Sequence, residues 1–400
     1  MKIVFVNRFF HPDVAPTARY AADVAFDLAA VGREVHAVTS RLAYDGSGAD
    51  YVAEQTVRGV RVHRVWTTSF GRGSLAGRAL DYFSFYCSAF FVLVRMLDQG
   101  DVVVAKTDPP LISVAAALAA RLRGARLVNW MQDVFPEAAA RAGMRLLKGP
   151  LGGLARVLRD WSVRQALVNV VLGGRMSVEV ARLVPGARLR VVSNWADGTA
   201  IRPAAPGADP LRRVRGLERK FVVGYSGNLG RVHDWETVLA AARLLEKERD
   251  VAFLFVGGGF HFASLRAAGL TNLHLQGYEP EERLGDSLAA CDVLLVSLLP
   301  GFEGLIVPSK FYAAAAAGRA VIFIGDKGGE IARKIALQGC GFSVTSGDGA
   351  ALASAIEELR AAPDRLRAMG ARARAAFERE WDRPIALARW REIIAAVERA

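Results

Sequence analysis

Residues 300–330 read PGFEGLIVPSKFYAAAAAGRAVIFIGDKGGE and follow an apolar run that is typical of a buried strand. Pro308 and Ser309 predict a helix start, because proline tolerates the first turn and a serine side chain can accept hydrogen bonds from free backbone N–H groups there. Lys310 lies in that turn, where the positive helix end disfavours a cation, so we expect an anion such as phosphate nearby. A solvated lysine is the equally weighted alternative.

The second part of the stretch predicts a strand at 320–324, followed by the loop GDKGGE. Gly328 and Gly329 would let the backbone approach a ligand, and Glu330 could point at polar hydroxyls. A strand, a phosphate-type helix start, a second strand and a glycine loop are together typical of one half of a nucleotide-binding parallel sheet.

Short β-branched runs alternate with longer amphipathic runs along most of the chain. We predict strands at 2–6, 34–39, 60–66, 101–105, 126–131, 167–172, 189–193, 221–225, 251–256, 272–276, 292–297, 320–324 and 341–344, and helices at about 17–31, 75–98, 111–123, 150–165, 175–184 and from 349 onward. Because strands that alternate with helices form parallel sheets, the pattern predicts an α/β protein with doubly wound sheets.

The domain organisation follows from length and from one break in the pattern. A chain of 400 residues is too long for one ordinary core. Residues 196–218 contain three prolines and no periodicity, so we expect a linker there between domains at 1–195 and 219–381. The final helix, at about 382–400, is free to pack back on the first domain.

Composition restricts the partners. The net charge of +12 fits nucleic acid, an anionic membrane surface or anionic substrates. No zinc-finger spacing, ribonucleoprotein motif or lysine-rich tail supports nucleic acid. The three cysteines are far apart, which excludes a Cys-x-x-Cys metal site and argues against a disulfide framework. The scattered cysteines favour a reducing cytoplasm. The start MKIVFVNRFF has too few apolar residues for a signal peptide core and reads as a first strand.

Two segments raise the question of a membrane. Residues 80–97, LDYFSFYCSAFFVLVRML, are shorter than the ~20 apolar residues of a span and contain Asp81 and Arg95. A core helix and a helix that dips into one leaflet both remain open. Residues 141–164 interleave basic and apolar side chains, which suits either an anionic headgroup layer or a solvated face.

Ligands of parallel sheets bind beyond the carboxyl ends of the strands, so the loops after strands are candidate sites. In GYSGNLGRVHDWE, glycines including Gly227 permit close backbone approach, and Arg231 and His233 suit a diphosphate. A tight turn with a surface arginine is the alternative. GGGF, beginning at Gly257, is a weaker signal of the same kind.

A further loop after a predicted strand lies in the first half of the chain and reads QDVFPE. Asp133 and Glu137 in this loop could do acid–base work. Asp133 could equally cap the next helix, and for Glu137 the role of a first-turn carboxylate is favoured.

Together these motifs carry a family resemblance. The stretches YSGNLGRVHDWETVLAAA, FLFVGGG, LQGYEP with ACDVLLVSL, PGFEGLIVPSKFYAAAAAGR, FIGDKGGEIA, NWMQDVFPE and SNWADGTAIRP resemble family 4 glycosyltransferases of the GT-B fold, in the bacterial branch that builds surface polysaccharide or O-antigen repeat units. They cover nearly the whole chain in the family's order. The resemblance implies two Rossmann-like domains that face each other across a cleft, with a nucleotide-diphosphate sugar held mainly by the C-terminal domain and the acceptor by the N-terminal one.

The resemblance also implies a retaining transfer without a cofactor or an essential metal, in which cations and helix N-termini stabilise the leaving diphosphate. A UDP-sugar is preferred from the family's habit alone. By motif position the catalytic candidates are Arg231, Lys310 and Asp133. Donor contacts are assigned to Gly227, Asn228, His233, Gly257, Glu303, Pro308, Ser309, Gly329 and Glu330, and acceptor contacts to Asp13, Thr17 and Gln132.

The chain departs from the family pattern at several positions. Asn228 and His233 occupy a loop in which most members carry an arginine and a lysine, so Arg231 is the expected substitute. The family's ribose-binding glutamate falls on Ala313, which leaves Glu303 or Glu330 for that contact. The frequent His-Asp pair of the first domain reads Gln-Asp here and removes a histidine base. A departing phosphate that accepts the acceptor's proton would not need one.

We therefore hypothesise a membrane-associated enzyme, on the cytoplasmic face, that extends a polyprenyl-diphosphate-linked sugar. A nucleotide-sugar epimerase of the same fold is one alternative, and it would need additional acid–base groups although the chain has only six histidines. A non-catalytic scaffold of a polysaccharide assembly complex is another, motivated by Ala313, and it predicts no nucleotide binding. A dehydrogenase is disfavoured because no Gly-x-Gly-x-x-Gly follows the first strand.

Overall fold

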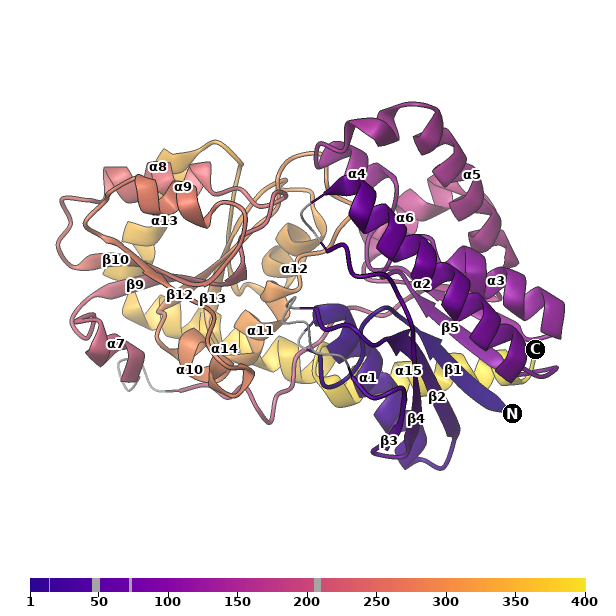
Figure 1. The fold of residues 1–400 in the computed structure, drawn as a ribbon. Coiled ribbons are helices and arrows are strands. Elements are labelled where there is room, and N and C mark those ends of the chain that lie inside the picture. Colours follow the sequence, from indigo (N-terminus) through magenta and orange to yellow (C-terminus); the bar gives the residue numbers. More distant parts are fainter. Residues whose placement is uncertain (14, 45–50, 72–73, 205–209) are drawn as a thin grey trace. The chain divides into compact units, whose positions relative to one another are not determined.

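The computed structural model describes residues 1–13, 15–44, 51–71, 74–204 and 210–400. The chain divides into two compact units. The first unit contains residues 1–193, 304–306 and 387–400, and the second contains residues 194–303 and 307–386. Each unit is built on its own parallel sheet, and we describe each by itself (Figure 1).

The first unit has an eight-stranded sheet in the order β3-β4-β2-β1-β5-β6-β7-β8. Its strands are β1 (Lys2–Val6), β2 (Glu34–Ser40), β3 (Glu54–Val57), β4 (Val60–Val65), β5 (Val102–Lys106), β6 (Arg126–Trp130), β7 (Val168–Val171) and β8 (Leu189–Val191). All neighbours pair in parallel except β3, which is antiparallel to β4. Our strand assignment missed β3, because this polar edge strand of four residues shows no apolar pattern.

Helices cover both faces of this sheet. They are α1 (Pro16–Ala30), α2 (Leu75–Met96), α3 (Ile112–Arg123), α4 (Glu137–Arg141), α5 (Pro150–Gln165) and α6 (Gly174–Leu183), with a 3-10 helix at Arg145–Lys148. Helices α2, α3 and α5 lie side by side on one face, and α1 lies on the other together with the end of α15 (Arg383–Glu398) (Figure 1). There Trp390 packs on Trp130 with ring centroids 4.3 Å apart, and both side chains are fully buried.

The second unit has a six-stranded, fully parallel sheet in the order β11-β10-β9-β12-β13-β14. Its strands are β9 (Phe221–Asn228), β10 (Val251–Gly258), β11 (Leu273–Gln276), β12 (Val293–Ser297), β13 (Ala320–Ile324) and β14 (Gly341–Val344). Chain order runs outward from β9 in one direction and from β12 in the other, so the order reverses between these two strands. Ligands of open parallel sheets bind at the carboxyl ends beside such a reversal.

The helices of the second unit are shorter up to α12 than in α13 and α14. They are α7 (Pro210–Val214), α8 (Glu236–Leu244), α9 (Phe262–Ala267), α10 (Leu284–Ala289), α11 (Lys310–Ala316), α12 (Glu330–Gln338), α13 (Gly349–Ala361) and α14 (Pro363–Glu380), with a 3-10 helix at Glu281–Arg283. Helix α7 falls within residues 196–218, where the sequence shows no periodicity. Its buried Arg212 pairs with Asp292, which accounts for order in a proline-rich segment.

Candidate functional site

Two glycine loops pack against each other at the carboxyl ends of β9 and β10. Gly227 pairs with Gly257 in the sheet, and a Cβ added to Gly257 would lie 2.3 Å from the carbonyl oxygen of Gly227. A Cβ on Gly259 would lie 2.4 Å from Asn228 Oδ1. Both Gly257 and Gly259 have positive φ, which side chains disfavour. The glycines of GGGF therefore allow the second loop to fit closely against the first.

Lys310 reaches this pair of loops from the first position of α11. A Cβ added to Gly227 would lie 3.1 Å from Lys310 Cε, so the lysine side chain passes directly over the glycine. Its Nζ lies 3.4 Å from His233 Nε2 and 5.2 Å from the centre of the Tyr225 ring. Within the described part of the chain no carboxylate forms an ion pair with Lys310. Burial lowers the pKa of Lys310 to about 8, which marks a cation whose charge lacks compensation.

His233 holds Lys310 from the side. Its Nδ1 lies 2.9 Å from the carbonyl oxygen of Ser297, so Nδ1 carries the proton and Nε2 is the acceptor that faces Lys310. Burial, followed by the charge of Lys310, lowers the pKa of His233 to about 3. The imidazole is therefore neutral at physiological pH and acts here as a hydrogen-bonding support for the lysine.

The expected capping role of Ser309 is wrong. Ser309 is the N-cap residue of α11, but its backbone is helical (φ −72°, ψ −19°) and its side chain accepts no hydrogen bond from the helix. Capping by serine requires extended backbone geometry, which turns the hydroxyl toward the free N–H groups. Pro308 is buried and Ser309 is half-buried beside it, so both contribute to the chain's path into Lys310.

Glu303 meets the glycine loop that follows β13. Its Oε2 accepts a hydrogen bond from the backbone N–H of Glu330 (3.1 Å), and a Cβ added to Gly329 would lie 2.2 Å from its Oε1. Glu303 therefore lies at the N-terminus of α12, where a carboxylate is favourable. The carboxylate of Glu330 instead pairs with Lys334 at 3.2 Å. The structure thus brings Glu303, Gly329 and Glu330 together, and Ala313 leaves a half-buried position without a polar side chain.

Arg231 lies in the loop between β9 and α8 and is exposed. Its guanidinium carbon lies 3.6 Å from the centre of the Phe260 ring. Among the residues that the structure describes, no carboxylate pairs with it either. Arg231 and Lys310 are thus two cations of the second unit that pair with no acidic side chain in the part of the chain that the structure describes.

In the first unit the structure adds a residue that sequence reasoning missed. Lys106 ends β5, is fully buried, and donates from Nζ to Gln132 Oε1 at 2.9 Å. The ammonium lies 3.4 Å from the centre of a Trp130 ring. Burial lowers its pKa well below the ordinary value, against the opposing charges of Asp108 and Asp133. A lysine at the end of the apolar run DVVVAK was the available signal, since a buried lysine is rare.

Several predicted acceptor-side residues lie around Lys106. Thr17 donates its hydroxyl proton to Asp108 (2.8 Å), and Gln132 bonds Lys106. Burial, followed by the charge of Asp108, raises the pKa of Asp133 to about 6. Because the Asp133 residue also meets solvent, water offsets part of this rise.

Two other carboxylates of the first unit have structural partners. Asp13 is nearly buried and accepts backbone N–H bonds from Ala15 and Tyr44, which braces the loop after β1. Glu137 is the first residue of α4 and pairs with the buried Arg159 at 3.0 Å, in keeping with the favoured first-turn role. Asp133 does not cap α4, because Pro136 occupies the N-cap position.

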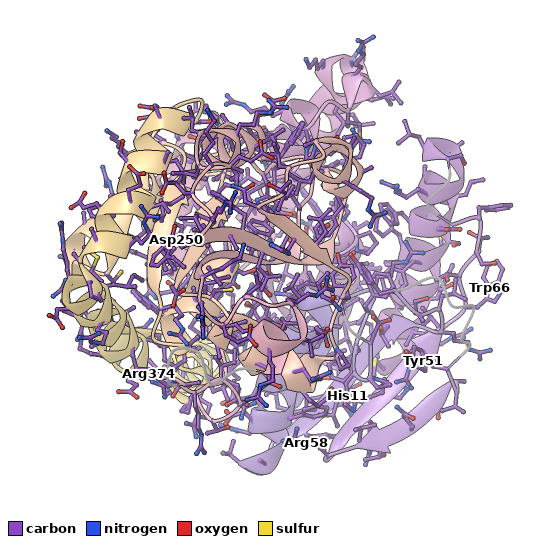
Figure 2. All side chains as sticks on the ribbon, turned by 90° about the vertical axis from the view of Figure 1, so that its left-hand side faces the viewer. His11, Tyr51, Arg58, Trp66, Asp250 and Arg374 are labelled. Carbon is purple, nitrogen blue, oxygen red and sulfur yellow. The ribbon has the colours of Figure 1, made fainter. Side chains whose placement is uncertain are left out.

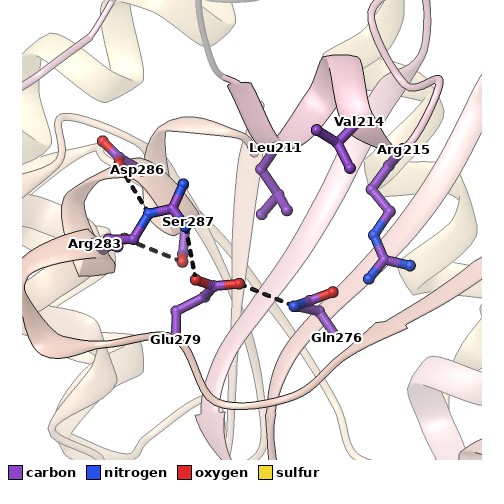
Figure 3. Close-up of a pocket in the computed structure, with 8 residues that line it drawn as sticks. All are labelled: Leu211, Val214, Arg215, Gln276, Glu279, Arg283, Asp286 and Ser287. Carbon is purple, nitrogen blue, oxygen red and sulfur yellow. Dashed lines mark hydrogen bonds and ion pairs between the residues drawn. The ribbon is translucent and has the colours of Figure 1, made fainter.

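A separate pocket of about 400 Å³ lies at another part of the second unit, between α7 and the segment after β11 (Figure 3). It is lined by residues that include Arg215, Gln276, Glu279 and Arg283, and Figure 3 shows Glu279 bridging Gln276 and Arg283. None of the predicted site residues lines it. Within the described residues no cluster of three or more histidine, cysteine or acidic side chains could hold a metal ion.

Comparison with protein families matches both halves of the chain. The family model "Glycosyl transferases group 1" matches residues 220–361, and the model "Glycosyl transferase 4-like domain" matches residues 17–195. The "Probable glycosyltransferase WbjE" of Pseudomonas aeruginosa is 33% identical over 279 residues, which cover 68% of this chain and 70% of that protein. The "Putative colanic acid biosynthesis glycosyl transferase WcaI" of Escherichia coli (strain K12) is 27% identical over 340 residues, covering 80% and 83%.

Solved structures share the fold over nearly the full chain. Sucrose-phosphate synthase from Thermosynechococcus elongatus superimposes with a TM-score of 0.78 at 15% identity, covering 99% of this chain and 100% of that one. Anabaena Alr3699/HepE in complex with UDP-glucose gives 0.73 at 15% identity, with 99% and 100% covered. WaaG, a glycosyltransferase involved in lipopolysaccharide biosynthesis, gives 0.70 at 14% identity, with 97% and 98% covered. The two parallel-sheet units are those of the GT-B fold, and the chain belongs to the group 1, or family 4, glycosyltransferases, which transfer sugars with retention of configuration.

Proposed function

We propose that this glycosyltransferase moves a sugar from a nucleotide-diphosphate donor to a polyprenyl-diphosphate-linked saccharide during surface polysaccharide synthesis, without a metal ion. The second unit holds the donor and the first unit holds the acceptor. The observation that carries the proposal is Lys310, a largely shielded cation that has no acidic partner among the described residues. It lies over Gly227 and is supported by a neutral His233. A diphosphate supplies the missing negative charge.

The donor class draws support from two sides. Lys310 and the glycine loops at the carboxyl ends of β9 and β10 lie together, at the end of the sheet where parallel sheets bind their ligands. Anabaena Alr3699/HepE, which shares the fold, is described in complex with UDP-glucose. A UDP-sugar is therefore the donor that we propose to test first. The name of WcaI refers to colanic acid biosynthesis, which supports a polysaccharide product.

The chemistry follows from the charges. In a retaining transfer the bond between the sugar's C1 and the diphosphate oxygen breaks, the acceptor oxygen bonds C1, and the acceptor proton passes to the departing phosphate. Lys310 and Arg231 stabilise the charge that develops on that diphosphate, in the place that a metal ion takes in other enzymes. Asp133, which is exposed and lies close enough to Lys106 for their charges to interact, is proposed to hydrogen-bond the acceptor hydroxyl.

We also propose that the first unit docks on the anionic inner face of the cell membrane. Among the described residues, α2 is the one helix long and apolar enough to cross a bilayer, and only 22% of its apolar window is buried. Its outward residues include Leu80, Phe83 and Phe91, each at least half exposed. Trp66, which Figure 2 shows projecting from the surface, is 63% exposed.

Helix α5, which packs on α3 beside α2, adds basic and apolar side chains to the same face of the sheet. Leu151, Leu154 and Val157 are more than half exposed, and Arg164 is exposed among them. Arg159 does not belong to this surface, because it is buried and bonded to Glu137. An exposed apolar face with arginines fits an anionic lipid surface.

Flotation with anionic vesicles tests this docking. Phe83→Ser with Phe91→Ser removes apolar side chains from α2 and should lower the recovery of protein with vesicles severalfold. Leu337→Ser with Val214→Ser is the matched control, since both positions are 81% exposed in the second unit. Equal recovery of the two double variants would rule out docking through α2.

A thermal-shift panel of UDP, GDP, dTDP and ADP tests the donor class. A nucleotide at a hundred times its dissociation constant stabilises the folded protein by about 2.7 kcal/mol, which is easily resolved. We expect one nucleotide, UDP first, to raise the melting temperature. No shift with any of the four would overturn the proposal and favour a scaffold without nucleotide binding.

A further inference from the structure

Phe260 is a large apolar residue that is not buried in the core. Its side chain is 55% exposed at the end of the GGGF loop. The one cation over its ring among the described residues is Arg231, with the guanidinium carbon 3.6 Å from the ring centre. An arginine at this distance is held by attraction between its charge and the π face of the ring. The pairing joins the loop after β9 to the loop after β10.

Backbone contacts fix the two loops relative to each other close to this pair. Leu229 donates its N–H to the carbonyl of Gly258 (2.7 Å), and His261 donates its N–H to the carbonyl of Leu229 (3.2 Å). Gly259 between them has φ +123°, and a Cβ there would lie 2.7 Å from the Leu229 nitrogen. The positions from which Arg231 and Phe260 project are therefore set by the backbone.

Aromatic contacts extend this support into α8. The Phe260 ring meets His261 edge to face, with centroids 5.0 Å apart. His261 in turn stacks on Trp235, the N-cap residue of α8, at 5.4 Å. Phe260 thus packs against a chain of rings that ends at a helix, and the guanidinium of Arg231 lies over its ring.

The stacking geometry leaves the hydrogen-bonding groups of Arg231 available. A guanidinium carries its five N–H donors at the edge of its plane, and stacking on a ring uses its face. No carboxylate competes for these donors within the described residues. A phosphate group can accept two parallel N–H bonds from such an edge.

We propose that Phe260 is a positioning residue that holds Arg231 by its face, so that the guanidinium edge is ready to bind the diphosphate of the nucleotide donor. This inference rests on the proposed function, because it needs a nucleoside diphosphate at the glycine loops. Phe260 itself touches no donor atom in this account. Its effect reaches the ligand only through Arg231.

Calorimetric titration of the full chain with UDP and with uridine tests the role. Phe260→Leu removes the π face at a surface position, so the variant should fold. We expect it to bind UDP about 2- to 5-fold more weakly, the effect of an exposed cation–π contact, and to bind uridine as the wild type does. Phe260→Tyr keeps the π face and should restore UDP affinity.

A double-mutant cycle with Arg231→Met separates positioning from a general effect on the loop. In the Arg231→Met background, Phe260→Leu should cause no further loss of UDP affinity. A loss that persists there, or equal UDP affinities of wild type and Phe260→Leu, would overturn the inference while leaving the proposed function intact. A wild type that binds none of the four nucleoside diphosphates would overturn the proposed function, and this inference with it.

Discussion

Replacing Lys310 by methionine should show how much the charge of the side chain, as distinct from its shape, contributes to binding a diphosphate. Methionine has nearly the same length and apolar stem, so the side chain can still pass over Gly227, but it carries no ammonium. Burial lowers the pKa of Lys310 from 10.5 to about 8 in the free protein. The poorly solvated charge of Lys310 therefore destabilises the free protein, and a bound diphosphate should offset that destabilisation.

The size of the effect follows from that shift. One pKa unit corresponds to about 1.4 kcal/mol, so restoring an ordinary lysine pKa would give at most about 3.5 kcal/mol. The residue keeps some solvent contact, so we expect about 2 kcal/mol, or a 30-fold weaker dissociation constant for UDP in Lys310→Met. Its thermal stability without ligand should equal or exceed that of the wild type, because a poorly solvated charge is removed.

The pH dependence of UDP binding tests the same claim independently. Above pH 8 the free protein loses the Lys310 proton, whereas the diphosphate complex keeps it. UDP affinity of the wild type should therefore be nearly constant between pH 7 and 8, where the terminal phosphate is already ionised, and fall about tenfold per pH unit above pH 8. Lys310→Met should lack this fall.

The measurement is calorimetric titration with UDP between pH 7 and 9. Lys247→Met is the matched control. Lys247 is exposed and precedes β10, so it lies at the amino ends of the strands, away from the glycine loops at their carboxyl ends. If Lys310→Met binds UDP within threefold of the wild type and shows the same pH profile, the reasoning about Lys310 is refuted.

Three further predictions concern stability. Lys106→Met should raise the free energy of unfolding by on the order of 1 kcal/mol in urea titration, because a fully buried ammonium is replaced by an apolar chain; a lower value would contradict this. Gly257→Ala should destabilise the protein by more than about 2 kcal/mol, since the new Cβ would lie 2.3 Å from a carbonyl oxygen. Gly347→Ala is the comparison: its φ is +89° but no atom lies within 4 Å of the new Cβ, so it should cost about 1 kcal/mol. Burial holds the pKa of His36 below 6.5, so its contribution to stability is complete above pH 6.5 and is lost as the pH falls below it; His36→Gln should show a shallower loss by acid titration followed with circular dichroism.

The regular elements were largely predictable. The strands at 2–6, 320–324 and 341–344 and the helix at 150–165 begin and end where the sequence placed them. Apolar β-branched runs and amphipathic periodicity report on burial directly, so most other bounds differ by only a few residues. The sequence analysis missed the edge strand β3, because a polar strand at the edge of a sheet needs no apolar face.

For the candidate site, the sequence predicted which loops contribute residues but not how those residues contact one another. Glycines and charges after strands pointed to the segments that contain Gly227 and Lys310, but not to their contacts. That Lys310 lies over Gly227 depends on β12 pairing with β9, a long-range arrangement that no local pattern encodes. The capping role expected of Ser309 failed because its backbone is helical. Lys106 and Phe260 were missed because their partners, Gln132 and Arg231, lie in loops that are distant in the sequence.

A crystal structure of the full chain with UDP is the most direct test of the central claim. We predict the diphosphate at the carboxyl ends of β9 and β12, with an oxygen about 3 Å from Lys310 Nζ. A diphosphate bound instead in the pocket beside Arg215 and Arg283 (Figure 3), or anywhere in the first unit, would contradict the account.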